Sequence, residues 1–355
     1  MADPLRVAVV GVGSFGRNHA RVYRELQAES AKNHEPIEVV GVVDANSAHL
    51  ESAARDFGVP TFSSVSDLLS QAKPQAVSVA VPTVAHMEVA QELLEKGIDV
   101  LIEKPLTRNL LEADALIKLA KQGNRIAMVG HLERFNPAVQ ATIPLITKPM
   151  FFECHRLSVF TPRSLDVDVV MDLMIHDLDI VLSMANSAVR EVRAVGLPIL
   201  TPKVDIANVR IEFDSGCVAN FTASRVSTER VRKLRFFQPY QYISLDFARR
   251  DVFALTVKQA NEAPESMMDF GANDEGVPQI VPAKPKVSGE EPLRTELRSF
   301  LDCVRTRKQP IVTLEDGRKA LALALEIQKQ MDEHRRRSHL DELMKKYPAK
   351  VPDGV

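Results

Sequence analysis

Two carboxylates and an imidazole lie at helical spacing near the middle of the chain. Asp172, His176 and Asp179 lie at positions i, i+4 and i+7 of an otherwise apolar run, which places them on one face of a helix. Burying these groups together is costly unless they are paired or functional. Because Asp172 can orient His176 and stabilise its charge, the pattern predicts a general base. A structural polar network and a metal site are the alternatives, and the lack of a second His or Cys in register argues against the metal.

A single lysine, Lys104, occupies a second position where chemistry is expected. It follows the apolar run Asp99–Ile102 within Glu103-Lys104-Pro105, so it lies at the carboxyl end of a predicted strand. Ligands of open α/β sheets bind at that edge. A partly desolvated ammonium there can hold and polarise a substrate oxygen. The alternative is an ordinary solvated lysine in a loop.

Three glycines near the N-terminus form a phosphate-binding pattern. The segment Gly11-Val12-Gly13-Ser14-Phe15-Gly16 directly follows a predicted strand and opens a predicted helix, in a chain where only 15 of 355 residues are glycine. Gly11 permits the tight turn, Gly13 lets a pyrophosphate approach the backbone, and Gly16 allows close helix–strand packing. The segment therefore predicts a dinucleotide cofactor at the helix N-terminus, with a purely structural turn as the alternative.

Asp44 follows the predicted strand Glu38–Val43 and is the expected ribose partner of such a cofactor. It lies farther from Gly16 than the usual separation of about 20 residues, and the polar stretch Glu29–Pro36 explains the difference as an inserted loop. A carboxylate there accepts hydrogen bonds from the ribose hydroxyls and repels a 2′-phosphate, and Ala45-Asn46-Ser47 adds no cation. The sequence therefore predicts NAD rather than NADP, although Asp44 could also cap the following helix.

Strand-like runs alternate with helical patterns up to about residue 130. The strands are rich in Val, Ile or Ala and have no polar face, as is typical of strands buried on both faces. They cover Arg6–Val10, Glu38–Val43, Ala76–Ala80, Asp99–Ile102 and Ile126–Val129. The helices cover Gly16–Ala28, Ala48–Phe57, Val65–Gln71, His86–Lys96 and Leu110–Gln122. This alternation predicts a doubly wound α/β domain with a parallel sheet over residues 1–130.

The pattern changes after residue 150 to β-branched runs of alternating polarity. These runs cover Met150–Val159, Val189–Val195, Ala207–Phe213, Cys217–Ala223, Lys233–Phe237, Tyr242–Phe247 and Val252–Val257. Consecutive strands, one pair joined by the hairpin signal Asp214-Ser215-Gly216, predict a largely antiparallel sheet in an α+β domain over residues 131–355. We expect one face to be covered by the helices Val170–Met184, Pro292–Arg307 and Leu314–Arg337. Asn261–Glu290 is predicted as a long surface loop.

Composition limits the class of protein further. A chain of 355 residues corresponds to about two domains at roughly 150 residues each. The net charge of −2 gives no electrostatic footprint for nucleic acid or anionic lipid, and no stretch approaches the roughly 20 apolar residues of a membrane-spanning helix. Cys154, Cys217 and Cys303 are odd in number and far apart, which suits neither a disulfide framework nor a metal site and favours a reducing cytoplasm.

Taken together and in order, these motifs resemble the Gfo/Idh/MocA oxidoreductases. The resemblance rests on the glycine pattern at 11–16, Asp44, Val81-Pro82-Thr83 with His86, Glu103-Lys104-Pro105 and the segment 172–179. It implies a Rossmann domain followed by an α/β domain with a large open sheet that commonly mediates oligomerisation, hence a homodimer or homotetramer. It also implies NAD(P)-dependent oxidation or reduction of a sugar or polyol hydroxyl.

Carried over by position, the resemblance implies roles for individual residues. Lys104 and His176 match the catalytic lysine and histidine of the family, Asp172 its assisting carboxylate and Asp179 a substrate-contacting position. The residues that match cofactor-lining positions are Pro82, Thr83, His86 and Glu103. His176 would take the hydroxyl proton with help from Asp172, Lys104 would polarise the reacting oxygen, and the nicotinamide would accept the hydride. Met174 departs from the family, where many members carry Gly, and its bulk is expected to reshape the pocket.

Residues 130–137, Gly-His-Leu-Glu-Arg-Phe-Asn-Pro, resemble the branch that oxidises UDP-N-acetylglucosamine-type nucleotide sugars at the 3-position. Arg134 and Asn136 are therefore expected to bind substrate, and Arg134 suits fork-like hydrogen bonds to a carbonyl or diphosphate oxygen. The cations Arg225, Arg230 and Arg232 could receive the diphosphate or be solvated sheet-edge charges. We expect a UDP-linked N-acetylhexosamine to be preferred over free sugars and inositols.

Three other functions stay open at the level of sequence. A non-catalytic NAD-binding sensor would keep the glycine pattern and Asp44, but it needs neither Lys104 nor a buried Asp172–His176 pair. A second alternative is a family enzyme that acts on a free sugar or polyol. A third uses transient oxidation by tightly held NAD to drive elimination, and accumulation of reduced cofactor would distinguish it from a simple dehydrogenase.

Overall fold

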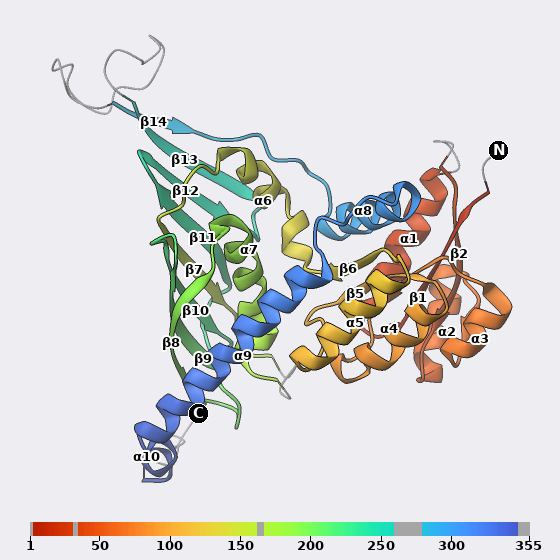
Figure 1. Ribbon diagram of the computed structural model, residues 1–355, viewed down its shortest axis with the longest axis horizontal. Helices are drawn as coiled ribbons and strands as arrows, with labels where there is room; N and C mark the ends of the chain where they lie inside the picture. Colours follow the sequence, from red (N-terminus) through yellow and green to blue (C-terminus); the bar gives the residue numbers. More distant parts are fainter. Residues whose placement is uncertain (1–2, 31–34, 162–166, 259–278, 347–355) are drawn as a thin grey trace, which may run out of the picture. The chain divides into compact units, whose positions relative to one another are not determined.

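The computed structural model describes residues 3–30, 35–161, 167–258 and 279–346 of the chain. Tertiary contacts divide the chain into two compact units: a first unit of residues 1–137 with 288–322, and a second unit of residues 138–287 with 323–355. Figure 1 shows one β-sheet in each unit, with helices packed against it. Contacts alone do not mark a folding domain, so the domains expected at residues 1–130 and 131–355 stay predictions.

A six-stranded parallel sheet forms the centre of the first unit, in the order β3-β2-β1-β4-β5-β6. The strands are β1 (Leu5–Val10), β2 (Ile37–Val43), β3 (Thr61–Phe62), β4 (Ala76–Val79), β5 (Asp99–Glu103) and β6 (Ala127–Gly130). The chain begins at the centre, moves outward to β3, and returns to the other side of β1. This order confirms the predicted doubly wound fold, whose ligand crevice lies where the order reverses, between β1 and β4.

Helices cover the sheet of the first unit and explain its apolar strands. They are α1 (Gly16–Ser30), α2 (Ser47–Phe57), α3 (Val65–Ala72), α4 (His86–Glu95) and α5 (Leu110–Gln122), each within a few residues of the predicted bounds. All residues of β4 and β5 are buried, which is why these strands have no polar face. Side chains of Asn46, Ser64 and Asn109 accept backbone N–H groups at the starts of α2, α3 and α5.

Helix α8 (Pro292–Thr306) also belongs to the first unit. It packs against α1 and against η2 (Leu132–Phe135), a short 3-10 helix after β6. The expectation that this helix covers the second sheet is therefore wrong. Its apolar stripe of Leu293, Leu297 and Phe300 shows which side is buried, but periodicity does not reveal the surface against which that side packs.

An eight-stranded sheet forms the second unit, in the order β14-β13-β12-β11-β7-β10-β9-β8. The strands are β7 (Phe151–Leu157), β8 (Val189–Leu197), β9 (Ile206–Phe213), β10 (Val218–Ser224), β11 (Val231–Gln238), β12 (Gln241–Asp246), β13 (Asp251–Lys258) and β14 (Gln279–Ala283). The pair β7–β10 is parallel and the other pairs are antiparallel, which confirms the largely antiparallel sheet. The predicted loop 261–290 is wrong at β14, and residues 261–278 lie outside the described residues.

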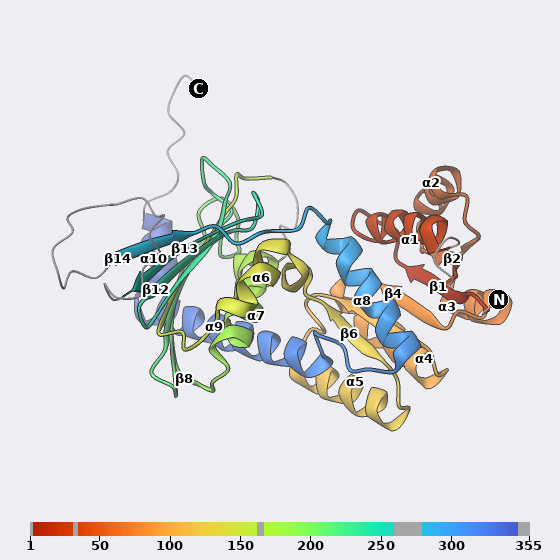
Figure 2. The same cartoon turned by 90° about the horizontal axis from the view of Figure 1, so that it is seen from above.

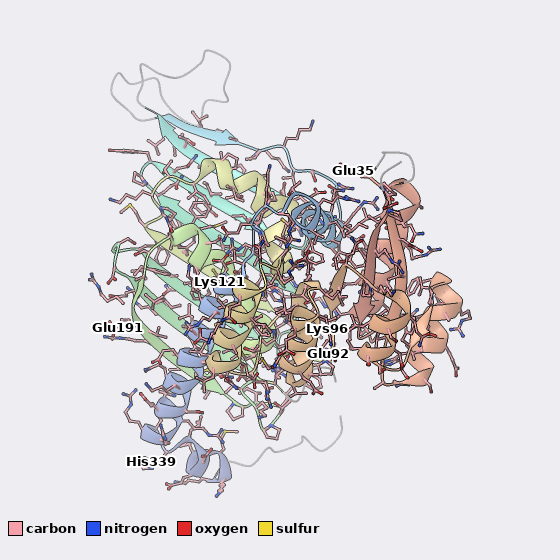
Figure 3. All side chains as sticks on the ribbon, turned by 45° about the vertical axis from the view of Figure 1, so that its right-hand side comes forward. Glu35, Glu92, Lys96, Lys121, Glu191 and His339 are labelled. Carbon is pink, nitrogen blue, oxygen red and sulfur yellow. The ribbon has the colours of Figure 1, made fainter. Side chains whose placement is uncertain are left out.

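One face of the second sheet is buried beneath helices, as the alternating sequence predicts. Along β7 every second residue is buried, and helix α7 (Ile175–Ala185) lies over this face in Figures 1 and 2. The hairpin between β9 and β10 turns through Gly216, which has a φ of +84° and donates its N–H to the carbonyl of Phe213. Charged side chains mark the edge strand β8; Glu191, labelled in Figure 3, projects outward and pairs with Arg193 (2.6 Å).

The remaining helices are α6 (Pro137–Thr142), η3 (Ile143–Leu145), α9 (Leu314–Arg337) and α10 (Leu340–Lys346). Residues 314–322 of α9 belong to the first unit and residues 323–337 to the second. Within the part of the chain that the structure describes, no helix has the length and apolar composition to span a membrane, and no cluster of His, Cys, Asp and Glu suits a metal ion. The three cysteines are free and buried.

Candidate active site

The glycine pattern forms a narrow turn from the end of β1 into α1. Gly11 has a φ of +86°, and a Cβ there would lie 2.6 Å from the carbonyl oxygen of Ala80. A Cβ at Gly16 would lie 1.7 Å from the carbonyl oxygen of Gly11, so only glycine fits at either position. Ser14 and Phe15 are exposed beside the turn. The result is a helix N-terminus preceded by accessible backbone, which is the arrangement that cradles phosphates.

Asp44 follows β2 and contacts the glycine turn. Its Oδ2 accepts the backbone N–H of Val12 (2.8 Å), and its Oδ1 accepts that of Asn46 (2.8 Å). Asn46 is the N-cap of α2, because its side chain accepts the N–H of Ala48. His49 Nδ1 lies 3.2 Å from Asp44 Oδ2, an imidazole that the sequence reasoning missed. Asp44 is thus held at the strand end where the ribose of a dinucleotide is expected.

His86 joins two loops at the carboxyl edge of the parallel sheet. It begins α4 and is 1% exposed, with Nδ1 3.0 Å from the carbonyl oxygen of Pro105 and Nε2 3.0 Å from that of Val81. Burial lowers the pKa of His86, and the hydrogen bonds to the carbonyls oppose that shift. Pro82 and Thr83 lie in the joined loop after β4. Contact of these three residues with a cofactor stays a prediction.

Lys104 follows β5 directly, at the edge of the sheet that the sequence predicts. Its side chain is half-buried, and the Lys104–Pro105 peptide bond is cis. Glu103, the last residue of β5, is only 8% exposed, and its Oε1 lies 3.0 Å from Nε2 of the fully buried His19 on α1. Glu103 therefore faces the protein interior, and its predicted contact with the cofactor stays a prediction.

The predicted substrate residues of the first unit lie in and just after η2. Arg134 is half-buried. Asn136 is 3% exposed and donates from Nδ2 to Glu133 Oε2 (2.9 Å), so its amide stabilises the turn after η2. Substrate contacts by Arg134 and Asn136 stay predictions.

Asp172, His176 and Asp179 come from two kinds of helix in the second unit. Val170–Met174 forms a π-helix, η4, and the α-helix α7 begins at Ile175. The prediction of one α-helix over residues 170–184 is therefore wrong in its first turn, which is π-helical. The spacing from Asp172 to His176 is thus not that of a regular α-helix. Single π-helical turns occur frequently at functional sites. Asp172 and His176 are half-buried, whereas Asp179 is 2% exposed.

Polar contacts fix α7 on the second sheet and join the start of η4 to α9. Arg156 of β7 forms a bidentate ion pair with Asp177 of α7, with Nε–Oδ2 at 2.9 Å and Nη2–Oδ1 at 2.7 Å, and both side chains are 4% exposed. Asp168 accepts two backbone N–H groups at the start of η4, and the amide of Gln328 donates to its other oxygen. Because Asp177 follows His176 directly, the ion pair also orients the helix that carries the histidine.

Two expectations about the substrate pocket differ from the structure. Met174 is fully buried, so its bulk fills the protein interior rather than lying beside an open pocket. Arg225 is 5% exposed and donates to the carbonyl of Val167 (2.6 Å), with Asp205 3.7 Å away, so it is no solvated sheet-edge charge. Arg230 and Arg232 are exposed.

Comparison with known proteins decides the family. A family model described as oxidoreductase family, NAD-binding Rossmann fold, matches residues 5–131, and a Gfo/Idh/MocA C-terminal domain model matches residues 150–237. The chain belongs to the Gfo/Idh/MocA oxidoreductase family. This confirms the resemblance of the motifs, and the chain is an NAD-dependent oxidoreductase.

Relatives of this Gfo/Idh/MocA protein are similar along most of its length. UDP-N-acetylglucosamine 3-dehydrogenase of Acidithiobacillus ferrooxidans is 34% identical over 91% of this chain and 96% of its own. A solved structure of that enzyme has a TM-score of 0.82 at 32% identity, covering 94% of this chain and 99% of that one. The scyllo-inositol 2-dehydrogenase (NAD(+)) of Bacillus subtilis is 26% identical over 88% and 90% of the two chains. Levoglucosan dehydrogenase in complex with NADH and levoglucosan, at 18% identity, TM-score 0.78 and 93% and 98% coverage, shares the fold.

The residues of the first unit fit the NAD that the family binds. At Gly13 the nearest atom to an added Cβ would be Cε1 of His49 at 3.8 Å, so the turn leaves open space beside its backbone. The glycine turn and the start of α1 would hold the pyrophosphate, and Asp44 would accept the ribose hydroxyls. Bound NAD supplies the acceptor for the two electrons removed from the substrate.

The sequence reasoning missed several polar residues that support the site, although two of them left a signal. Arg156 occupies an inward position of the alternating strand β7, and Glu296 lies within the apolar stripe of α8. A charge at an inward position signals a buried polar contact. His19 and His49 lie on ordinary helical faces, and only tertiary contacts reveal their carboxylate partners.

Proposed function

We propose that this protein oxidises the ring 3-hydroxyl of a UDP-linked N-acetylhexosamine with NAD. The observation that carries the proposal is the 34% identity to UDP-N-acetylglucosamine 3-dehydrogenase over 96% of that enzyme. Arg134 supports it from the residues, because a half-buried guanidinium after β6 suits recognition of a carbonyl or diphosphate oxygen.

The proposed chemistry assigns one role to each polar group. His176 accepts the proton of the substrate hydroxyl as general base, and Asp172 assists by stabilising the imidazolium. Lys104 donates a hydrogen bond to the reacting oxygen and stabilises the negative charge that develops on it. Arg134, Asn136 and Asp179 bind the substrate.

A substrate panel tests the assignment. Purified protein is incubated with NAD and with UDP-N-acetylglucosamine, UDP-N-acetylgalactosamine, UDP-glucose, a GDP-sugar, free N-acetylglucosamine and inositols, and NADH is followed by absorbance. We expect turnover with a UDP-N-acetylhexosamine and a product oxidised at position 3. Turnover with free sugars and none with UDP-sugars would reject the nucleotide-sugar substrate and leave the oxidoreductase assignment intact.

A free polyol is the second candidate substrate, because the relative from Bacillus subtilis, named for scyllo-inositol, matches 90% of its length. The inositols in the panel test this candidate directly. NAD binding without turnover of any sugar would favour a sensor, and product formed without net accumulation of NADH would favour an elimination driven by transient oxidation.

We also propose that the protein forms a homo-oligomer through the outer face of its second sheet. Phe151, Phe237 and Tyr242 lie opposite one another on β7, β11 and β12, with ring centroids 5.9 Å and 5.2 Å apart. Phe237 and Phe253 are 40% and 41% exposed on this sheet. An aromatic row on an exposed face suits burial against a second copy, as a homodimer or within a homotetramer.

A cytoplasmic location is proposed on the state of the cysteines. Cys154, Cys217 and Cys303 are free and buried. Free buried thiols suit a reducing compartment. Fractionation of the source cells, with immunodetection of the protein, tests the location.

A further inference from the structure

Glu296 is an anomaly in the interior of the first unit. The residue lies on α8 with no exposed surface, and neither of its carboxylate oxygens has a hydrogen-bond partner among the described residues. Burying a carboxyl group without a partner costs free energy, whether or not the group is charged. Such a group requires an explanation from its surroundings.

The surroundings of Glu296 contain a second buried carboxylate. Helix α8 packs against α1, and α1 carries His19, the partner of Glu103. Glu103 and Glu296 are therefore buried in the same region, where the charge of Glu103 adds to burial in raising the pKa of Glu296. Glu103 is held by Nε2 of His19 at 3.0 Å. A Cβ at Gly130 would lie 2.6 Å from Glu103 Oε1, so the glycine at the end of β6 leaves the space that the carboxylate occupies. The carboxyl groups of Glu103 and Glu296 therefore share one buried region, and Glu103 directly precedes Lys104 in the chain.

Among the described residues, the elements packed against α8 supply no hydrogen bond and no ion pair to Glu296. On α1, the buried hydroxyl of Tyr23 is engaged with Ser78 Oγ (2.8 Å), and burial raises its pKa. From η2, Glu133 and Arg134 are half-buried, and Glu133 accepts a hydrogen bond from Asn136. Burial first, and the charge of Glu103 second, raise the pKa of Glu296 well above its usual value.

We propose that Glu296 is a positioning residue for Lys104, acting through Glu103. Glu296 keeps its proton, Glu103 carries the negative charge against His19, and this arrangement fixes the end of β5. Lys104 is the next residue along the chain, so a shift of Glu103 moves the lysine. Ionisation of Glu296 would place two negative charges in the buried region and displace that strand end. The inference rests on the proposed catalytic role of Lys104.

The sign of the pH effect follows from proton linkage. A carboxyl group whose pKa is higher in the folded than in the unfolded protein stabilises folding fully only below the unfolded value. The wild type therefore loses stability as the pH rises from the ordinary pKa of glutamic acid to the raised one. Across that window the folding equilibrium constant of the wild type falls about ten-fold per pH unit relative to that of a variant whose residue 296 does not ionise.

The test compares Glu296→Gln, which keeps the neutral shape, with Glu296→Ala and with Arg298→Gln, which removes an exposed charge from the same helix. Thermal unfolding, kcat, and NAD affinity by calorimetry are measured from acidic to alkaline pH. We expect E296Q to be more stable than the wild type at alkaline pH, to match it at acidic pH, and to keep its kcat at pH values where that of the wild type declines. E296A should lower kcat about ten-fold, because it misplaces Lys104, with little change in NAD affinity, and R298Q should follow the wild type.

Infrared spectroscopy gives a reading that needs no substrate. The wild type should show the carbonyl stretch of a protonated carboxylic acid at neutral pH, and E296Q should lack it. Unfolding curves of wild type and E296Q that coincide at every pH, or absence of the infrared band, would overturn the proposal. Loss of kcat in E296Q with intact NAD affinity would also overturn it, because the proton itself would then be required. Because stability and spectra are measured without sugar, they hold or fail independently of the substrate assignment.

Discussion

The two units of this protein bury charged side chains in different ways. In the second unit, Arg156 and Asp177 form a bidentate ion pair with almost no exposed surface. In the first unit, Glu103 pairs with His19, and Glu296 lies beside them without a hydrogen-bond partner among the described residues. In the second unit an opposite charge compensates the buried carboxylate of Asp177, whereas in the first unit burial raises the pKa of Glu296.

This difference shows that burial alone does not determine what a substitution does. Removing Arg156 leaves the carboxylate of Asp177 buried without its partner, which destabilises the fold. Replacing Glu296 by glutamine removes a group whose ionisation burial opposes, which stabilises the fold at alkaline pH. Two substitutions of buried ionisable residues should therefore have opposite signs.

The largest effect is expected at the two proposed reacting groups, one in each unit. Lys104→Ala and His176→Ala should each lower kcat by about 100- to 10,000-fold, because a polarising cation and a general base act in the transition state. NAD affinity should stay near that of the wild type in both variants, since neither residue belongs to the glycine turn. Steady-state kinetics measure kcat, and calorimetry measures NAD affinity. Near-normal kcat at saturating substrate in one variant would reject the role proposed for that residue.

The next largest effect concerns the ion pair of the second unit. Arg156→Leu should destabilise the protein by about 3–5 kcal/mol, because it leaves a buried charge unpaired. Chemical denaturation measures the free energy of unfolding. Arg190→Leu is the matched control, since its pair with Asp214 is 61% and 57% exposed and its loss should leave stability almost unchanged. Equal effects of the two substitutions would contradict the comparison between buried and exposed pairs.

The charge at the glycine turn should set cofactor choice in the first unit. Asp44→Ala should weaken NAD binding by about 10- to 100-fold, the contribution of hydrogen bonds to a charged group. It should weaken NADP binding less or strengthen it, because the like charge opposite the 2′-phosphate is gone. Calorimetry with both cofactors is the measurement. If the wild type binds NAD and NADP equally well, Asp44 does not select between the two cofactors.

The smallest effect is expected on the outer face of the second sheet. Phe237→Glu should raise the dissociation constant of the homo-oligomer about ten-fold, because it replaces an apolar contact with a charge. Analytical ultracentrifugation over a range of concentrations measures it. Lys96→Glu, exposed in the first unit and outside the proposed interface, is the control for a change of charge alone. A monomeric wild type would reject the proposed oligomer.

Helices show where sequence reasoning succeeds and where it stops. The periodicity of residues 292–306 predicts α8 within one residue, yet the packing partner expected for it was wrong. Apolar spacing depends only on which side of a helix is buried, whereas the surface that covers this side depends on the path of the whole chain. The same limit applies to residues 170–185, where spacing predicts a helix but not the π-helical turn of η4.

The same distinction between local sequence and tertiary contacts applies to the candidate site. The amino-acid sequence by itself determined the glycine turn, the strand end at Lys104 and the segment around His176, because each depends on residues close together in the chain. Only the tertiary structure decided which buried side chains support these segments, since His19, Glu103 and Glu296 come from three elements far apart in the chain. Local backbone preference and periodicity act over a few residues, and they determine the elements. Burial and charge pairing depend on what those elements bring together, so the raised pKa of Glu296 and the anchoring of α7 by Arg156 are properties of the folded chain.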